Sequence, residues 1–298
     1  STRKESSAAS DVYKRQARAK TAGRGSLEGA IVKPAHRYTR PPRVACLSRH
    51  ATDPAHTFSC LTLSSVGVQD PTRIPRVLER LREAWEGQPD LPLATLFGIL
   101  ANQGAGWGST DEELEELLRR EAEDHPAELP RTDEGLAAVD ILVETTSPDH
   151  RVTLTVAGDA VVRSGTERDR QPSVWRYSSI RPTGPGRMLV VADADGVEHR
   201  LGVVTLISRV GAAETLEGLE RQEVGNSVWL IVFAGGARAL VTQRIHLWQV
   251  DRRTVQKSTH AWDRIESAQP GEEFRFAPAG GGEPVALGEV TQILLLEA

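Results

Sequence analysis

The sequence predicts an α+β protein in which a small N-terminal three-helix module precedes an all-β region made of two tandem repeats. Three observations in the 298 residues lead to this fold class. Apolar residues between 70 and 125 recur at helical spacing, whereas beyond 138 they alternate with polar ones, as strands require. The stretch beyond 138 also repeats itself at a spacing of 85 to 87 residues, which indicates a duplicated unit.

The beginning of the chain differs from the rest in charge and in pattern. Residues 1–69 carry 12 Arg and Lys against 4 Asp and Glu, whereas residues 70–298 carry 24 against 37, so the net charge of -5 joins a basic leader to an acidic body. The run Asp11–Gln16, DVYKRQ, resembles the translation of a transposon mosaic end that is used to tag sequencing libraries. We therefore expect residues 1–68 to be a non-native or disordered leader, with the natural start at Val66 or Val68.

The helical module is predicted over residues 69–125. Asp70-Pro71 favours a helix start, because Asp supplies a capping oxygen and Pro fits the first turn. Asp90 is expected to cap a second helix that runs through Leu100, and the stretch from Ser109 to Glu112 fits a capping box for a third. The apolar stripe of the first helix consists of Ile74, Val77, Leu78, Leu81 and Trp85.

The first part of this module resembles known proteins. The segment RIPRVLERLREAWEGQPDLPLATLFGIL, from Arg73 to Leu100, resembles a run found in short bacterial helical proteins. The resemblance covers residues 70–121 and implies a similar small bundle. It implies no activity, so it assigns no functional residues.

The β region is predicted to hold two copies of one unit. Residues 126–138 are rich in turn residues and are expected to be a linker. The first repeat covers 139–208, a connector covers 209–225, and the second repeat covers 226–298. The copies are expected to be either separate small barrels or one β domain with a pseudo-twofold axis. The strands of the first copy are predicted near 139–146, 151–163, 172–180, 187–193 and 197–207.

Several positions recur when the copies are aligned. Ile141 is placed opposite Val228, and glycines that interrupt a strand in each copy predict a β-bulge or a bend. Charged and aromatic positions recur too, and they are the candidate binding residues. The recurring pairs are Arg151 with Arg238, Trp175 with Trp262, Glu198 with Glu283, and Gly202 with Gly288.

No catalytic residue, cofactor or metal site is predicted. Both cysteines, Cys46 and Cys60, lie in the leader, so the body has no thiol for a disulfide or for zinc. No two histidines of the body have zinc-ligand spacing. The sequence contains no signal-peptide core and no long apolar span, so a cytoplasmic location without membrane contact is expected.

Three functional hypotheses follow. The leading one is a non-enzymatic binding protein with a protein partner, because the architecture is clear and no reactive group recurs. The second is an enzyme with a site in the cleft between the repeats, in which the recurring Arg and Glu residues act. The third is an RNA-binding small barrel that stacks bases on Trp175 and Trp262. Nucleic acid is disfavoured because residues 70–298 carry a net charge of -13, and a buried structural role for both tryptophans is the alternative to stacking.

Overall fold

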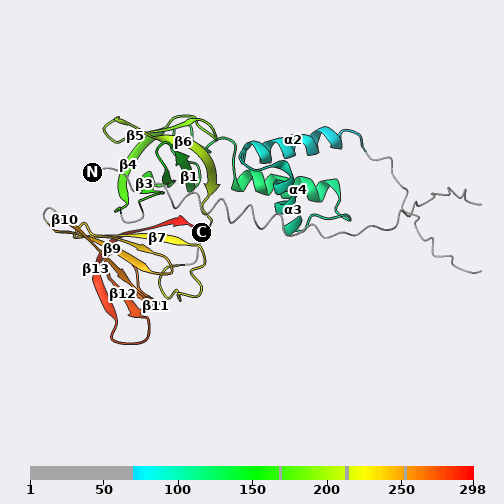
Figure 1. Cartoon of the computed structure of the whole chain (residues 1–298). Coiled ribbons are helices and arrows are strands. Elements are labelled where there is room, and N and C mark those ends of the chain that lie inside the picture. The colour runs from blue at the N-terminus through cyan, green and yellow to red at the C-terminus, as the bar shows by residue number, and fades with distance from the viewer. Residues whose placement is uncertain (1–69, 168–169, 212–214, 252–253) are drawn as a thin grey trace, which may run out of the picture. The chain divides into compact units, whose positions relative to one another are not determined.

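A computed structural model describes residues 70–298 except 168–169, 212–214 and 252–253 (Figure 1). The leader hypothesis for residues 1–68 falls outside these residues. Three helices come first and two β domains follow, which confirms the α+β class with two tandem β domains. The helices are α2 (Arg73–Glu86), α3 (Leu93–Asn102) and α4 (Asp111–Asp124).

The helices exist where the sequence predicts them, but their starts differ in detail. Asp70 is not the N-cap of α2. Its carboxylate accepts a hydrogen bond from the amide of Thr72 (2.9 Å), which is the N-cap, and the helix begins at Arg73. Asp90 is not the cap of α3, because Pro92 occupies that position. The capping box of α4 is formed by Thr110 and Glu113, one residue beyond the predicted pair.

Only part of the predicted apolar stripe of α2 faces the module's core. That core is formed by Ala84, Leu96, Leu100 and Leu118, with Leu81 packed against it. Ile74 and Leu78 remain 52% and 58% exposed. The module has just three short helices, so a stripe as wide as that of α2 exceeds what two neighbours can cover.

A buried carboxylate ties the three helical segments together. Glu121 of α4 is 4% exposed. Its two oxygens accept hydrogen bonds from the side-chain amides of Gln88 (2.6 Å) and Gln103 (2.9 Å), which follow α2 and α3. These bonds offset the cost of burying the carboxylate and hold the ends of the helices in place.

The first β domain is a closed barrel of six antiparallel strands. Each strand pairs with the next in the chain, and the last pairs with the first. A register shift beside Gly202 places a bulge in the last strand, as predicted. The strands are β1 (Ile141–Thr146), β2 (His150–Leu154), β3 (Asp159–Ser164), β4 (Ser173–Ile180), β5 (Met188–Asp193) and β6 (Glu198–Arg209).

One predicted strand of this barrel is in fact two. The prediction of a single strand over 151–163 is wrong, because the chain turns between β2 and β3. The amide of Gly158 donates to the carbonyl of Thr155 (3.0 Å), and the amide of Thr155 donates to the carbonyl of Asp159 (3.0 Å). The apolar residues on both sides of the turn are buried, so alternation alone did not reveal it.

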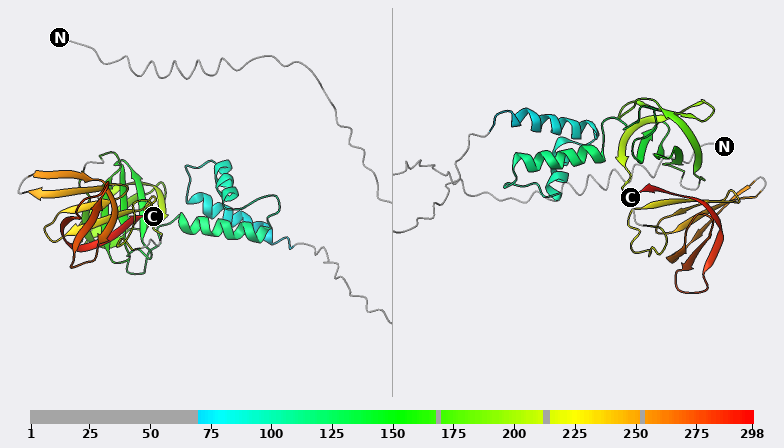
Figure 2. Two further views of the ribbon diagram at one scale, coloured as in Figure 1. Left: turned by 90° about the horizontal axis from the view of Figure 1, so that it is seen from below. Right: turned by 180° about the vertical axis from the view of Figure 1, so that it is seen from behind.

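The second β domain is a seven-stranded half-barrel, and the right-hand view of Figure 2 shows it as a sheet separate from the barrel. The strand order is β10-β9-β8-β7-β13-β12-β11. A bulge beside Gly288 matches the one beside Gly202. The strands are β7 (Val228–Phe233), β8 (Arg238–Val241), β9 (Ile245–Asp251), β10 (Thr254–His260), β11 (Trp262–Ser267), β12 (Glu273–Pro278) and β13 (Val285–Glu297).

The two domains share one strand order, with a single difference. In the barrel, β4 pairs with β3 through its first half and with β5 through its second half. In the half-barrel, these two roles fall to separate strands, β10 and β11, on either side of Ala261. The repeat predicted from sequence is therefore a repeat of topology, in which one strand of the second copy is broken.

Each β domain has its own core. The barrel core includes Leu129 and Ala137, so the segment expected to be a linker contributes side chains to it. The half-barrel core includes Leu216, Leu219 and Val224 from the expected connector. Each segment thus packs onto the β domain that follows it.

A fourth apolar cluster joins the two β domains. Val161 of the barrel and Leu230 and Leu296 of the half-barrel are fully buried together. Polar contacts surround this cluster: the hydroxyl of Thr153 donates to the carbonyl of Leu296 (3.2 Å), and the amide of Gln292 donates to Asp159 (2.9 Å). The last strand of the chain therefore packs against both domains.

Candidate functional site

The strand register corrects the predicted pairing of the tryptophans. Trp175 pairs with Ala160 in the barrel, and the matching position of the half-barrel, opposite Ile245, is His260. Trp262 pairs with Pro278 just as Tyr177 pairs with Asp193. Trp262 is therefore equivalent to Tyr177, and Trp175 has no tryptophan counterpart.

Hydrogen bonds confirm this equivalence. The hydroxyl of Tyr177 donates to the carbonyl of Thr155 (2.6 Å), and Nε1 of Trp262 donates to the carbonyl of Thr242 (2.9 Å). The two threonines are themselves equivalent, because each lies four residues beyond the matched arginines Arg151 and Arg238. Trp262 is fully buried in the half-barrel core and offers no ring face to a ligand.

Trp175 lies in a different setting. It is half-buried beside the barrel core, and its ring centroid is 4.6 Å from that of His199. Nε2 of His199 lies 2.9 Å from Oδ2 of Asp193. The hydrogen bonds from His199 and from the amides of Val197 and Asp195 lower the pKa of Asp193. This cluster holds the turn between β5 and β6 in shape.

The register also shifts the alignment of the first strands. Glu144 pairs with Arg151, and Val232 pairs with Arg238. Glu144 is thus equivalent to Val232, which makes the predicted match of Ile141 with Val228 wrong by one residue. Since a shift of one residue moves a strand's side chains to the opposite face, this correction decides which positions line the core.

The four charged candidates do not gather at one place. Glu198 forms an exposed ion pair with Arg181 (2.6 Å), and Glu283 is exposed in the loop before β13. Arg238 donates to the carbonyl of Pro172 across the two β domains, and burial lowers its pKa. Of the four, only Arg151 lines the cavity that lies between the two β domains.

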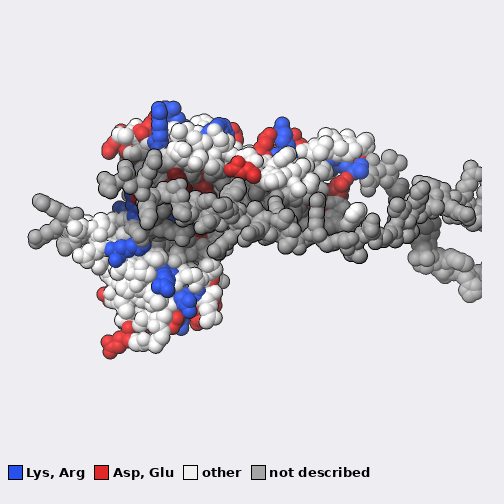
Figure 3. All heavy atoms as spheres, viewed as in Figure 1, with Lys and Arg blue, Asp and Glu red and all other residues white. Residues whose placement is uncertain are grey.

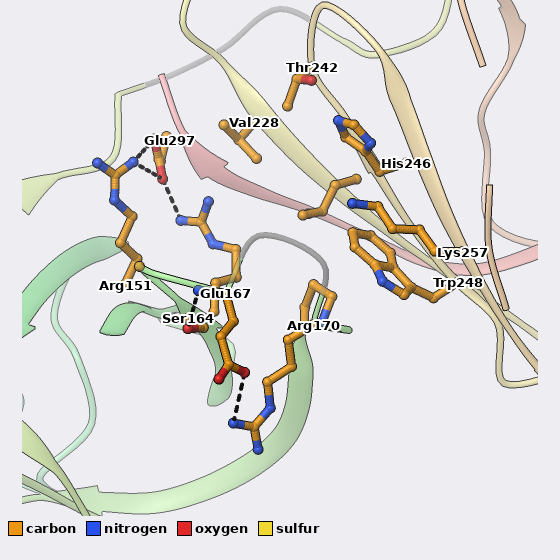
Figure 4. A pocket seen from close by; sticks show the side chains of 14 residues that line it. Arg151, Ser164, Glu167, Arg170, Val228, Thr242, His246, Trp248, Lys257 and Glu297 are labelled. Carbon is orange, nitrogen blue, oxygen red and sulfur yellow. Dashed lines mark hydrogen bonds and ion pairs between the residues drawn. The ribbon is translucent and has the colours of Figure 1, made fainter. Parts of the chain in front are cut away.

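That cavity lies between the two β domains and has a volume of about 520 Å³ (Figure 4). Seven of its lining residues come from each domain, and the volume is in the range of small-molecule sites. The barrel contributes Arg151, Arg163, Ser164, Gly165, Glu167, Arg170 and Pro172, and the half-barrel contributes Val228, Leu240, Thr242, His246, Trp248, Lys257 and Glu297.

Two arginines share one carboxylate at the inner wall. Glu297 accepts from Arg151 at 3.2 Å, and its Oε1 lies 2.5 Å from Nη2 of Arg163. The side chain of Arg163 is 11% exposed, and its Nε has no hydrogen-bond partner among the described residues. Burial lowers the pKa of Arg163, although the Glu297 carboxylate opposes the effect. This guanidinium is therefore incompletely compensated.

The rim of the cavity combines charge with aromatic and apolar groups. Nζ of Lys257 is 5.4 Å from the ring centroid of Trp248, a cation–π distance. Figure 4 shows these two side chains alongside each other, with Val228 nearer the Glu297 cluster. On the barrel side, Arg170 and Glu167 form an exposed ion pair (4.0 Å).

Sequence reasoning missed most of these residues because it looked for positions that recur. Arg163 pairs with Arg151, and its counterpart opposite Arg238 is Trp248. The lining thus includes positions at which the copies differ, such as Arg163 and Trp248, beside the recurring Arg151. One signal was present: Lys257 is the only lysine in residues 66–298.

Among the described residues, no group of three or more His, Cys, Asp or Glu side chains could hold a metal ion. No helix in the described ranges is long and apolar enough to cross a membrane. On the face drawn in Figure 3, basic and acidic side chains of the described residues are interspersed.

No family model matches the chain, and the searches of curated proteins and of solved structures found no match either.

Proposed function

We propose that this chain is a non-enzymatic binding protein that holds a small molecule in the cavity between its two β domains. The observation that carries the proposal is the cavity itself, to which each domain contributes seven residues. The copies differ at several of its lining positions, as at the equivalent positions of Arg163 and Trp248. The duplication therefore builds one asymmetric site rather than two equal ones.

The surroundings of the cavity favour a preformed site. The buried cluster of Val161, Leu230 and Leu296 lies at the contact between the domains, and the carboxylate of Glu297 contacts two arginines of the barrel. A cavity held in this way loses little free energy to ordering when a ligand enters.

The enzyme hypothesis places its site in the same cleft but relies on other residues. Glu198 and Glu283 lie outside the cavity lining, so the recurring glutamates of that hypothesis are not brought together there. Arg151 remains, but its guanidinium is engaged by Glu297 and by Glu144 (3.7 Å). Binding without chemistry accounts for this arrangement more simply.

A thermal-shift screen of the full chain against small metabolites tests the proposal. We expect some compounds to raise the melting temperature, and we expect Val228→Trp, which fills the cavity with an indole, to abolish the shift. Leu240→Trp is a second blocking variant in case the first folds poorly. Val156→Trp adds the same group at a site that is 50% exposed and outside the lining, so it should keep the shift.

Two results would contradict the proposal. Stabilisation that persists in both blocking variants would place binding elsewhere. Recovery of a chemically altered compound, detected by mass spectrometry after incubation with the protein, would favour the enzyme hypothesis instead.

The helical module supports a second candidate function, which is contact with a protein partner. Ile74 and Leu78 lie on α2 and are more than half exposed, and Phe97 of α3 is 46% exposed. Replacing both Ile74 and Leu78 by Lys should leave the module's core intact, because neither residue belongs to it. If a partner binds here, it should co-purify in stoichiometric amount with the wild type and be lost from the double variant.

A further inference from the structure

The charges that line the cavity indicate what kind of ligand it holds. Four lining side chains carry a permanent positive charge, and two are carboxylates. The cations are Arg151, Arg163, Arg170 and Lys257, and the carboxylates are Glu167 and Glu297. The described lining thus has a net charge of +2, although residues 70–298 as a whole carry a net charge of -13. Positive lining on a negative body favours an anionic ligand.

The inner wall of the cavity, at Arg151 and Arg163, is where an anionic ligand gains most binding free energy. Glu297 is the carboxylate nearest to Arg163, and it also contacts Arg151. Nε of Arg163 lies buried without a hydrogen-bond partner among the described residues. Because an unpaired buried donor is costly, a ligand acceptor that reached this guanidinium would remove the cost.

The remaining lining is apolar and limits the kind of anion. Val228 and Leu240 are half-buried and line the cavity, together with Pro172 and the buried side chain of Trp248. Nζ of the exposed Lys257 lies over the Trp248 ring, 5.4 Å from its centroid (Figure 4). A fully hydrated inorganic ion would leave this apolar surface uncovered, whereas an organic body would bury it.

Resting on the proposed function, we infer that the ligand is a small organic anion: an acidic group on a compact apolar body. The acidic group accepts hydrogen bonds from the arginine side of the cavity, and the apolar body covers Val228 and Leu240. A carboxylate, a sulfonate and a phosphate monoester share this chemistry, and the probes below separate them.

The test uses one ring with different substituents. Binding of naphthalene-2-sulfonate, 2-naphthoate, 2-naphthyl phosphate, neutral 2-naphthol and inorganic sulfate to the full chain is measured by isothermal titration calorimetry. We expect the three naphthyl anions to bind at least about tenfold more tightly than 2-naphthol, since one charge-assisted hydrogen bond is worth that factor. Sulfate alone should bind weakly, and the best of the three anions identifies the acidic group.

Matched variants place the binding in the cavity. Arg170→Gln should weaken naphthyl-anion binding about threefold to tenfold, and so should Lys257→Met, which keeps the apolar stem. Arg181→Gln is the control, because Arg181 is an exposed arginine in an ion pair, like Arg170, but lies outside the lining. It should leave the affinity unchanged.

The possible failures are distinguishable. If 2-naphthol binds as tightly as the anions and Val228→Trp abolishes its binding, the anionic ligand class is overturned while the cavity keeps its function. If no probe binds, or if Val228→Trp and Leu240→Trp leave all binding intact, the ligand class and the proposed function are both overturned. Equal losses of naphthyl-anion affinity in Arg170→Gln and Arg181→Gln would mean that the protein's net charge, not the cavity lining, causes the loss. That result would also contradict the inference.

Discussion

Single buried side chains show how the two β domains keep a common plan with different residues. Tyr177 and Trp262 occupy the same register position, and each donates to the carbonyl of an equivalent threonine. Tyr177 additionally accepts a hydrogen bond from the amide of Ala137 (3.1 Å), which fastens the segment before β1 to the barrel. What the repeat retains here is the hydrogen bond, not the residue type.

Tyr177→Phe should lower the free energy of unfolding by about 1–3 kcal/mol, because it leaves the Ala137 amide buried without an acceptor. Urea unfolding followed by tryptophan fluorescence measures the change. Burial raises the pKa of Tyr177, so the folded state holds the phenol proton more tightly. The associated stability is present below the ordinary tyrosine pKa and is lost as pH rises above it, and the variant should lack this alkaline loss. Ser178→Ala, at an exposed neighbour, should cost less than about 0.5 kcal/mol. Equal costs at the two positions would contradict the assigned role of Tyr177.

At the scale of elements, the long last strand of each domain bends at a glycine in the left-handed region. Gly202 has φ 110° and Gly288 has φ 124°, and each lies beside a register shift. Their surroundings differ. A Cβ at Gly202 would lie 2.7 Å from the carbonyl oxygen of Pro148, whereas the nearest atom to a Cβ at Gly288 is Cδ1 of Phe233 at 3.8 Å.

This pair of glycines allows backbone strain to be separated from steric overlap. Gly288→Ala should cost about 1–2 kcal/mol of unfolding free energy, the price of a left-handed conformation for an L-residue. Gly202→Ala should cost about 3 kcal/mol or more, because backbone oxygens near its Cβ must also shift. Differential scanning calorimetry of both variants compares them. Equal losses would show that the close approach at Gly202 is relieved without cost.

At the scale of the whole molecule, the last strand links the two β domains. Leu296 is buried between them, and Glu297 contacts both Arg151 and Arg163 of the barrel. Strand β13 is also hydrogen-bonded to β7 and β12 within its own domain. Strand β13 therefore ties the half-barrel to the barrel.

Glu297→Leu should destabilise the protein by about 3–5 kcal/mol, because it leaves the Arg163 guanidinium buried without its counter-ion. Combining it with Arg163→Met should restore most of the loss, since a well-packed apolar pair often replaces a buried ion pair without cost. Urea unfolding of the wild type, both single variants and the double variant gives the coupling. Additive losses would mean that Arg163 and Glu297 do not depend on each other.

The sequence by itself determined the order of the modules and the presence of a repeat. Three local signals were read correctly or nearly so, because each depends on neighbours in the chain. They are the helical spacing of apolar residues, the capping box, predicted one residue too early, and the strand-interrupting glycines Gly202 and Gly288. The turn around Gly158 was missed because its flanking apolar residues are buried on both sides. The predicted match of Trp175 with Trp262 is wrong because it relied on residue identity. What the two β domains share is the hydrogen-bond register of their strands.

Only the tertiary structure decided where a ligand fits. The cavity joins residues more than 100 positions apart, such as Arg163 and Glu297, and its lining includes positions at which the copies have diverged. No spacing in a single sequence reports such contacts, because the domain interface that creates them depends on the packing of Val161 against Leu230 and Leu296. Local physics fixes the strands and turns along the chain, whereas the site arises from how two finished domains bury their shared apolar surface.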